Sequence, residues 1–157
     1  MANWTGKVVA VHVGEQGQPL RSVEAAEAVA GVGLEGDRYA QKAGTFSKKH
    51  APDREITLIE MEALTALERD YAIRLTALAS RRNVATEGVP LNHLVGQTFR
   101  VGGATVRGLR LCEPCGHLQE RTGEPQLVAG LRHRGGLRAQ IVTSGTIRPG
   151  DPITLEG

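Results

Sequence analysis

Glycine divides this chain into short pieces. Twenty of the 157 residues are glycines, and they separate brief apolar runs along most of the sequence. Glycine adopts backbone conformations that other residues avoid, so this spacing indicates frequent turns between short strands. Only residues 60–75 have a convincing helical pattern, because apolar side chains recur there every three or four positions from Met61 to Leu75. The sequence therefore predicts a β-rich chain with one substantial helix.

The remaining segments are assigned from alternation and turn signals. Gly102 and Gly103 lie between two β-type runs and predict a hairpin. Residues 81–88 are polar and are predicted to be a link without regular structure, and residues 31–39 are predicted to form a tight glycine-rich loop. The predicted strands are 6–13, 23–29, 55–59, 97–101, 104–111, 137–142 and 153–155, with short helical turns at 90–96 and 125–131. Many strands and few helices favour an α+β, mainly β fold, a barrel or curled sheet with peripheral helices.

Composition limits the classes of function. The length fits one domain spanning residues 1–157. A net charge of +2 is too small to indicate nucleic-acid binding, and two cysteines are too few for a disulfide framework. The N-terminus lacks the pattern of a signal peptide, and no apolar run is long enough to span a membrane. We therefore expect a cytoplasmic protein without a nucleic-acid or membrane partner.

The sharpest local feature is the pair Cys112 and Cys115, separated by Glu113 and Pro114. A thiolate is both a nucleophile and a soft-metal ligand. The spacing is compatible with a redox pair, or with a zinc site completed by His117, with or without His133. It is equally compatible with a single functional Cys115, or with two ordinary buried thiols. The spacing alone leaves these four interpretations open.

Two further segments contain groups that bind anions. Arg81 and Asn83 offer a guanidinium and an amide that would hold a phosphate or a ring edge, or would simply end the preceding helix. Asp37 and Arg38 follow glycines in a bend that would form an anion nest or an ordinary turn. A third segment, residues 132–138, is locally basic and would contact a phosphate or form a solvated loop. Neither glycine-rich fingerprint of nucleotide-binding proteins is present.

Taken in order, five segments resemble the MOSC family, the domain found at the C-terminus of molybdenum cofactor sulfurases. They cover nearly the whole chain. They are GLEGDRY at 33–39, DREITLIEMEAL at 53–64, RRNVATEGVPLNHLVGQTFRVG at 81–102, RLCEPCGHL at 110–118 and GGLRAQIVTSGTIRPGDPI at 135–153. The resemblance implies a curled antiparallel or mixed β-barrel with a few peripheral helices.

The resemblance also implies a function and a site. The chain would bind the molybdenum cofactor, with Cys115 ligating molybdenum or carrying sulfur. Arg81 and Asn83 match an element among the pterin-phosphate contacts, and Asp37 and Arg38 match one that serves the same pocket. Some relatives in this family reduce N-hydroxylated compounds. If this chain is an enzyme, the resemblance implies the same reaction, with electrons from a partner protein. The alternatives are a non-enzymatic sulfur or cofactor carrier that docks on a cysteine desulfurase, and a small structural zinc domain.

The chain departs from the larger reductases of this family. Residues 42–53 read KAGTFSKKHAPD where such members have a His-Gly-Gly segment. The sequence also contains no flavin, iron–sulfur or pyridoxal-phosphate module. We therefore expect a separate protein to supply the electrons or the sulfur.

Overall fold

The backbone closes into a β-barrel. The computed structural model describes residues 3–41, 51–114 and 116–156. Seven strands follow one another around the barrel in the order β11-β7-β8-β9-β5-β6-β1, and pairing of β1 with β11 closes it. Every neighbouring pair is antiparallel except β5 and β6, which are parallel. The strands are β1 (Thr5–Val13), β5 (Ile56–Glu60), β6 (Val84–Glu87), β7 (Thr98–Val101), β8 (Ala104–Leu111), β9 (Leu137–Thr143) and β11 (Pro152–Leu155).

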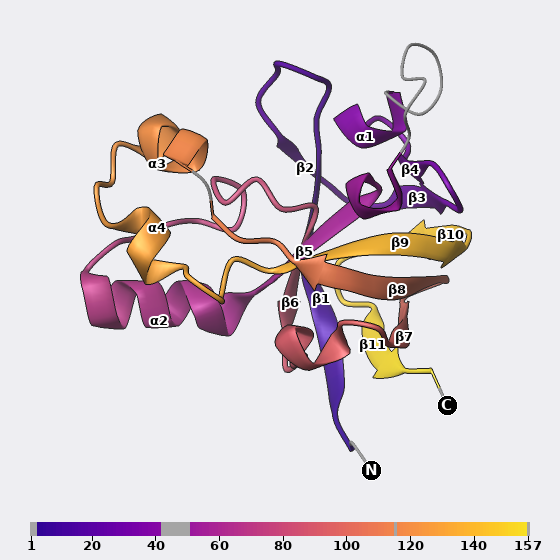
Figure 1. Cartoon of the computed structure of the whole chain (residues 1–157). Coiled ribbons are helices and arrows are strands. Elements are labelled where there is room, and N and C mark those ends of the chain that lie inside the picture. The colour runs from indigo at the N-terminus through magenta and orange to yellow at the C-terminus, as the bar shows by residue number, and fades with distance from the viewer. Residues whose placement is uncertain (1–2, 42–50, 115, 157) are drawn as a thin grey trace.

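Smaller elements extend the barrel. Strand β2 (Arg21–Val23) pairs with the end of β1, and β10 (Gly145–Ile147), β3 (Ala26–Val29) and β4 (Gly33–Leu34) form a separate three-stranded sheet. Helix α1 (Arg38–Gln41) and the 3-10 turns η2 (Pro52–Arg54) and η3 (Leu91–Leu94) connect strands. Both chain ends lie at the same end of the barrel (Figure 1).

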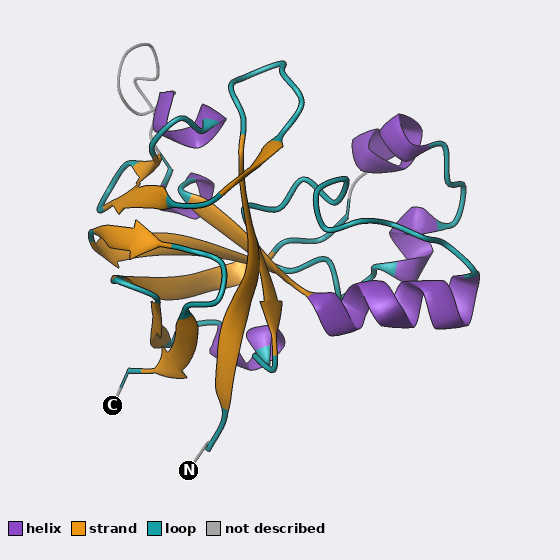
Figure 2. Ribbon diagram, turned by 180° about the vertical axis from the view of Figure 1, so that it is seen from behind, coloured by secondary structure: helices purple, strands orange, loops and turns teal. Residues whose placement is uncertain are grey.

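Three helices cover one side of the barrel. They are α2 (Met61–Tyr71), α3 (Gly116–Thr122) and α4 (Leu127–Gly130), and Figures 1 and 2 show them grouped together beside the strands. A cluster of buried leucines with Ile73 holds them to one another; its leucines are Leu67, Leu118, Leu127 and Leu131. Among the described residues, no helix is both long and apolar enough to cross a membrane.

The barrel interior is aliphatic, as the scarcity of aromatic residues implies. Phe99 is fully buried there among valines, leucines and isoleucines, and the partly buried Trp4 packs against the same core. Burial of such side chains contributes roughly 1.5–3 kcal/mol each relative to exposure, which makes this core the main source of stability.

The predicted architecture is confirmed, but several assignments are wrong. The strand predicted over 23–29 is divided between β2 and β3 in separate sheets, and the loop predicted over 31–39 contains β4. Residues 81–88 are not a link, because Val84–Glu87 form β6 in the middle of the sheet. Their polar side chains misled the prediction, since Thr86 is buried and donates a hydrogen bond to the carbonyl of Ile59. The long helix ends at Tyr71 rather than Leu75.

The early end of α2 has a local cause. Ala72 adopts the left-handed conformation with φ 56°, and its N–H caps the helix on the carbonyl of Glu68. The apolar pattern continues to Leu75 because Ile73 and Leu75 pack against the same cluster without being helical. Apolar periodicity indicates which residues are buried, and here the buried segment extends beyond the end of the helix.

Gly136 allows β9 to start close against β5. Its φ is 110°, and a Cβ atom there would collide with the carbonyl oxygen of Leu58. We predict that Gly136→Ala lowers the free energy of unfolding by about 3 kcal/mol, from backbone strain and overpacking together. Gly150 is the matched control, since its φ is 92° but nothing lies within 4 Å of the added carbon. Urea unfolding should give a loss of only about 1 kcal/mol for Gly150→Ala; equal losses would contradict this account.

Candidate functional site

A buried aspartate fixes the glycine-rich bend. Asp37 is fully buried and its Oδ1 accepts hydrogen bonds from the backbone N–H of Gly14 at 3.1 Å and from Nη1 of Arg38 at 3.1 Å. Its other oxygen accepts from the N–H of Tyr39 at 3.4 Å. The backbone N–H of Arg38 in turn donates to the carbonyl of Gly14 at 2.7 Å. These bonds hold the bend against the end of β1.

Arg38 links that bend to the segment preceding β6. Its Nη2 donates to the backbone carbonyl of Arg81 at 3.1 Å, and its guanidinium lies 4.5 Å from the centre of the Tyr39 ring. A guanidinium over an aromatic face is attracted by the ring, and this adds to the hydrogen bonds. Arg38 is therefore committed to interactions within the protein that fix the backbone at Arg81.

Arg81 adopts an unusual backbone conformation beside other cations. Its φ of 64° lies in the left-handed region, which residues other than glycine seldom occupy. Burial lowers the pKa of its guanidinium, and the neighbouring charges of Arg121 and Arg38 lower it further. Like charges gathered around a partly buried cation favour the binding of an anion.

Asn83 is buried and joins the strands β1, β5 and β6. Its Oδ1 accepts hydrogen bonds from the backbone N–H of Thr57 at 3.0 Å and from the Thr57 hydroxyl at 3.1 Å. Its Nδ2 donates to the carbonyl of His12 at 3.1 Å. The side-chain amide thus lies within the barrel wall, and its hydrogen bonds fix the position of the preceding residues.

Arg82 connects the same segment to Cys112. Its Nε donates to the carbonyl of Gly135 at 2.8 Å and its Nη2 to the carbonyl of Cys112 at 3.2 Å. Cys112 itself is buried, and its N–H donates to the carbonyl of Gly136 at 2.7 Å. Cys115 lies outside the described residues, between Pro114 and the start of α3 at Gly116.

Sequence analysis named neither Arg82 nor Arg121 as a site residue, and it singled out Arg138 only as part of the basic segment 132–138. Arg138 lies on β9, half-buried, and its Nη1 donates to the carbonyl of Asp53 at 3.4 Å. Burial acts to lower the pKa of Arg138, but the acidic groups of Cys112, Tyr39 and Asp53 outweigh it and leave the pKa raised. For Arg121, the available signal was its position in the helix that follows Cys115.

The zinc and redox interpretations stay predictions. Nothing is described of the His117 side chain, and Cys115 is outside the described range. His133 is largely exposed and its Nδ1 lies 3.0 Å from a carboxylate oxygen of Glu113. Within the described part of the chain, no three His, Cys, Asp or Glu side chains are grouped so that they would hold a metal ion.

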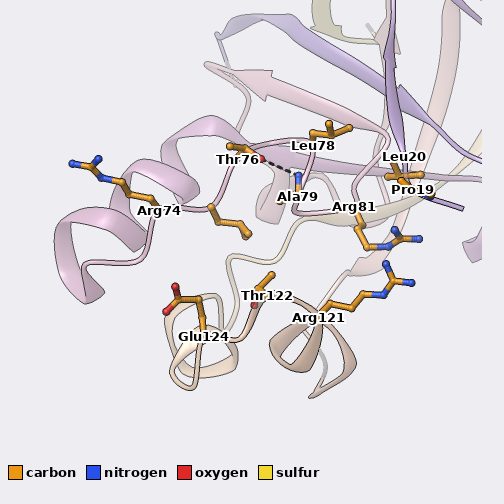
Figure 3. A pocket seen from close by; sticks show the side chains of 11 residues that line it. Pro19, Leu20, Arg74, Thr76, Leu78, Ala79, Arg81, Arg121, Thr122 and Glu124 are labelled. Carbon is orange, nitrogen blue, oxygen red and sulfur yellow. Dashed lines mark hydrogen bonds between the residues drawn. The ribbon is translucent and has the colours of Figure 1, made fainter.

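A cavity of about 470 Å³ opens beside Arg81. Apolar side chains, including Leu20, Leu75 and Leu78, form part of its wall. Figure 3 shows the guanidinium groups of Arg81 and Arg121 at one end, with the carboxylate of Glu124 away from them. The cavity therefore combines an apolar surface with a cationic end, which suits a flat molecule that carries an anionic group.

Comparison with solved structures confirms the barrel. The chain is similar to the YuaD protein from Bacillus subtilis, with a TM-score of 0.77, 18% identity, and coverage of 96% of this chain and 97% of that one. It is also similar to YiiM from Geobacillus stearothermophilus (TM-score 0.75, 19% identity, 97% and 75% coverage) and to YiiM from Escherichia coli (0.68, 18%, 96% and 70%). At these identities the likeness establishes the fold alone.

Sequence comparison identifies the family. A search of curated proteins finds no match. The family model described as the MOSC domain, however, matches residues 44–154, most of the chain. This family is associated with the molybdenum cofactor. The chain belongs to the MOSC domain family.

Proposed function

We propose that this protein binds the molybdenum cofactor with Cys115 as a ligand of molybdenum, and reduces N-hydroxylated compounds with electrons from a partner protein. One observation carries the proposal. The segment of Arg81, Arg82 and Asn83 is hydrogen-bonded on one side to Arg38 of the glycine-rich bend and on the other to the carbonyl of Cys112. Three segments far apart in the sequence of a MOSC-family chain thus adjoin one another.

The described residues fit the chemistry of this cofactor. The cofactor carries a phosphate monoester, a flat pterin ring and a metal bound through sulfur. The cavity beside Arg81 offers a cationic end for the phosphate and an apolar wall for a ring. A thiolate at position 115 is the soft ligand that such a metal prefers.

The candidate residues divide into one that contacts the ligand and others that position it. The guanidinium of Arg81 would donate charge-assisted hydrogen bonds to the phosphate. Arg38 holds the backbone carbonyl of Arg81, and Asp37 orients Arg38. Asn83 fixes the chain two residues further on, where β6 begins. Preorganisation of this kind lowers the entropy cost of binding.

The proposed reaction balances with an external donor. The N–O bond of a hydroxylamine breaks, two electrons from the partner and two protons are taken up, and the products are an amine and water. When bound, the cofactor supplies the two-electron chemistry at its metal. The protein's own residues bind and orient the cofactor, and a well-oriented reactant removes much of the entropic barrier.

The two cysteines should differ in their effect on molybdenum content. Protein purified without oxygen from cells that make the cofactor should contain close to one molybdenum per chain. Cys115→Ser should lose most of it, because a hydroxyl is a poor ligand for a soft metal. Cys112→Ser should retain it, since the Cys112 side chain is buried and its carbonyl, not its thiol, accepts the bond from Arg82. Elemental analysis of the three proteins measures this.

Other outcomes of the same analysis favour other functions. Stoichiometric zinc lost equally from both variants would contradict the proposal and support a structural zinc site. Absence of any metal, with a persulfide on Cys115 in mass spectra, would instead support a sulfur carrier that docks on a desulfurase.

Substitutions of Arg81 and Asn83 distinguish a residue that binds the cofactor from one that positions the binding segment. Arg81→Gln should weaken cofactor retention about 10- to 100-fold while leaving the unfolding midpoint unchanged, because it removes a charge-assisted bond at the surface of the cavity. Asn83→Ala should instead lower the free energy of unfolding by about 3 kcal/mol, since it leaves buried groups of Thr57 and His12 without partners. Urea unfolding and molybdenum content together check both. Loss of stability in Arg81→Gln, or none in Asn83→Ala, would refute this division.

A further inference from the structure

Arg121 reaches the same cavity as Arg81 from a different part of the chain. Arg81 precedes β6 in the barrel wall, whereas Arg121 lies in the last turn of α3. Both line the cavity, and Figure 3 shows their guanidinium groups toward the same end of it. Two cations from separate elements at one end of a cavity offer two sets of N–H donors to an anion.

The electrostatics support an anion at this position. After burial, the charge of Arg121 is the largest cause that lowers the pKa of Arg81. An anion bound between these two cations would be attracted by both of them. A phosphate monoester carries nearly two negative charges at neutral pH, so it matches two guanidinium groups.

The rest of the cavity determines how such a ligand lies. Glu124 lines the cavity away from the two arginines, and its carboxylate repels an anionic group there. Apolar residues, among them Leu75 and Leu78, lie along the wall. A ligand would therefore place its phosphate at the arginine end and a flat ring against the apolar wall.

We propose that Arg81 and Arg121 form a two-sided clamp for the phosphate monoester of a ring-bearing ligand. This inference rests on the proposed function for the identity of that ligand, and it adds a binding residue on α3. It also links the phosphate to the cysteine segment, because α3 begins at Gly116, directly after Cys115. Leu118 packs α3 against the cluster of α2 and α4, and the phosphate would tie its far end to the barrel.

The test measures binding of a pterin phosphate monoester to the purified apoprotein by calorimetry. Arg121→Gln should weaken binding at least about tenfold, as expected for one lost charge-assisted hydrogen bond, and Arg121→Lys should lose less. Arg100→Gln is the matched control, because Arg100 is exposed on β7 and does not line the cavity. It removes the same charge and should change the affinity less than twofold. The unphosphorylated pterin should bind the wild type and Arg121→Gln equally weakly.

A second readout detects the link to α3. The pterin phosphate should slow amide hydrogen exchange across residues 116–122 in the wild type, and not in Arg121→Gln. This measurement needs neither molybdenum nor turnover, so it remains informative whatever metal the protein holds.

The outcomes distinguish the clamp from the proposed function. Equal affinity of wild type and Arg121→Gln for the pterin phosphate would overturn the clamp, even if molybdenum is retained through Cys115. Arg121-dependent binding of the ester by a protein that never retains molybdenum would support the clamp and defeat the proposed function.

Discussion

The hydrogen bonds of one buried amide determine where the candidate site lies. Asn83 accepts from Thr57 on β5 and donates to His12 on β1, so it joins three neighbouring strands at one place in the barrel. The position of the chain just before Asn83 is therefore fixed. Arg81 and Arg82 occupy this position. Their hydrogen bonds with Arg38 and Cys112 hold the glycine-rich bend and the cysteine segment beside it. An exposed loop without this buried connection would not hold a guanidinium in a strained backbone conformation.

The arginines of this region make different kinds of contact because of this arrangement. Arg38 and Arg82 donate to backbone carbonyls and so shape the protein, whereas Arg81 and Arg121 line a cavity. Side chains whose hydrogen bonds hold the backbone supply rigidity. We propose that the two arginines that line the cavity take part in recognition. The positive φ of Arg81 fits this view, because strain of this kind tends to be retained at functional sites.

Local sequence signals predicted most of the fold, and they failed where burial contradicted polarity. The hairpin around Gly102 and the first strand were readable from turn chemistry and alternation. Strand β6 was not, because Asn83 and Thr86 look exposed until their partners on other strands are known. Within the candidate site, the resemblance to the MOSC family indicated Asp37, Arg38, Arg81 and Asn83. Their separate roles depend on contacts between distant segments, which a single sequence does not encode in any local pattern.

The central claim is that one pocket serves the three segments around Asn83. Crystals of the protein loaded with the molybdenum cofactor would test it most directly, through anomalous scattering measured at the molybdenum absorption edge. The account predicts one molybdenum peak beside the sulfur of Cys115, with the phosphate of the same cofactor within hydrogen-bonding distance of Arg81. A molybdenum peak elsewhere on the barrel, or a phosphate that makes no contact with Arg81, would contradict it.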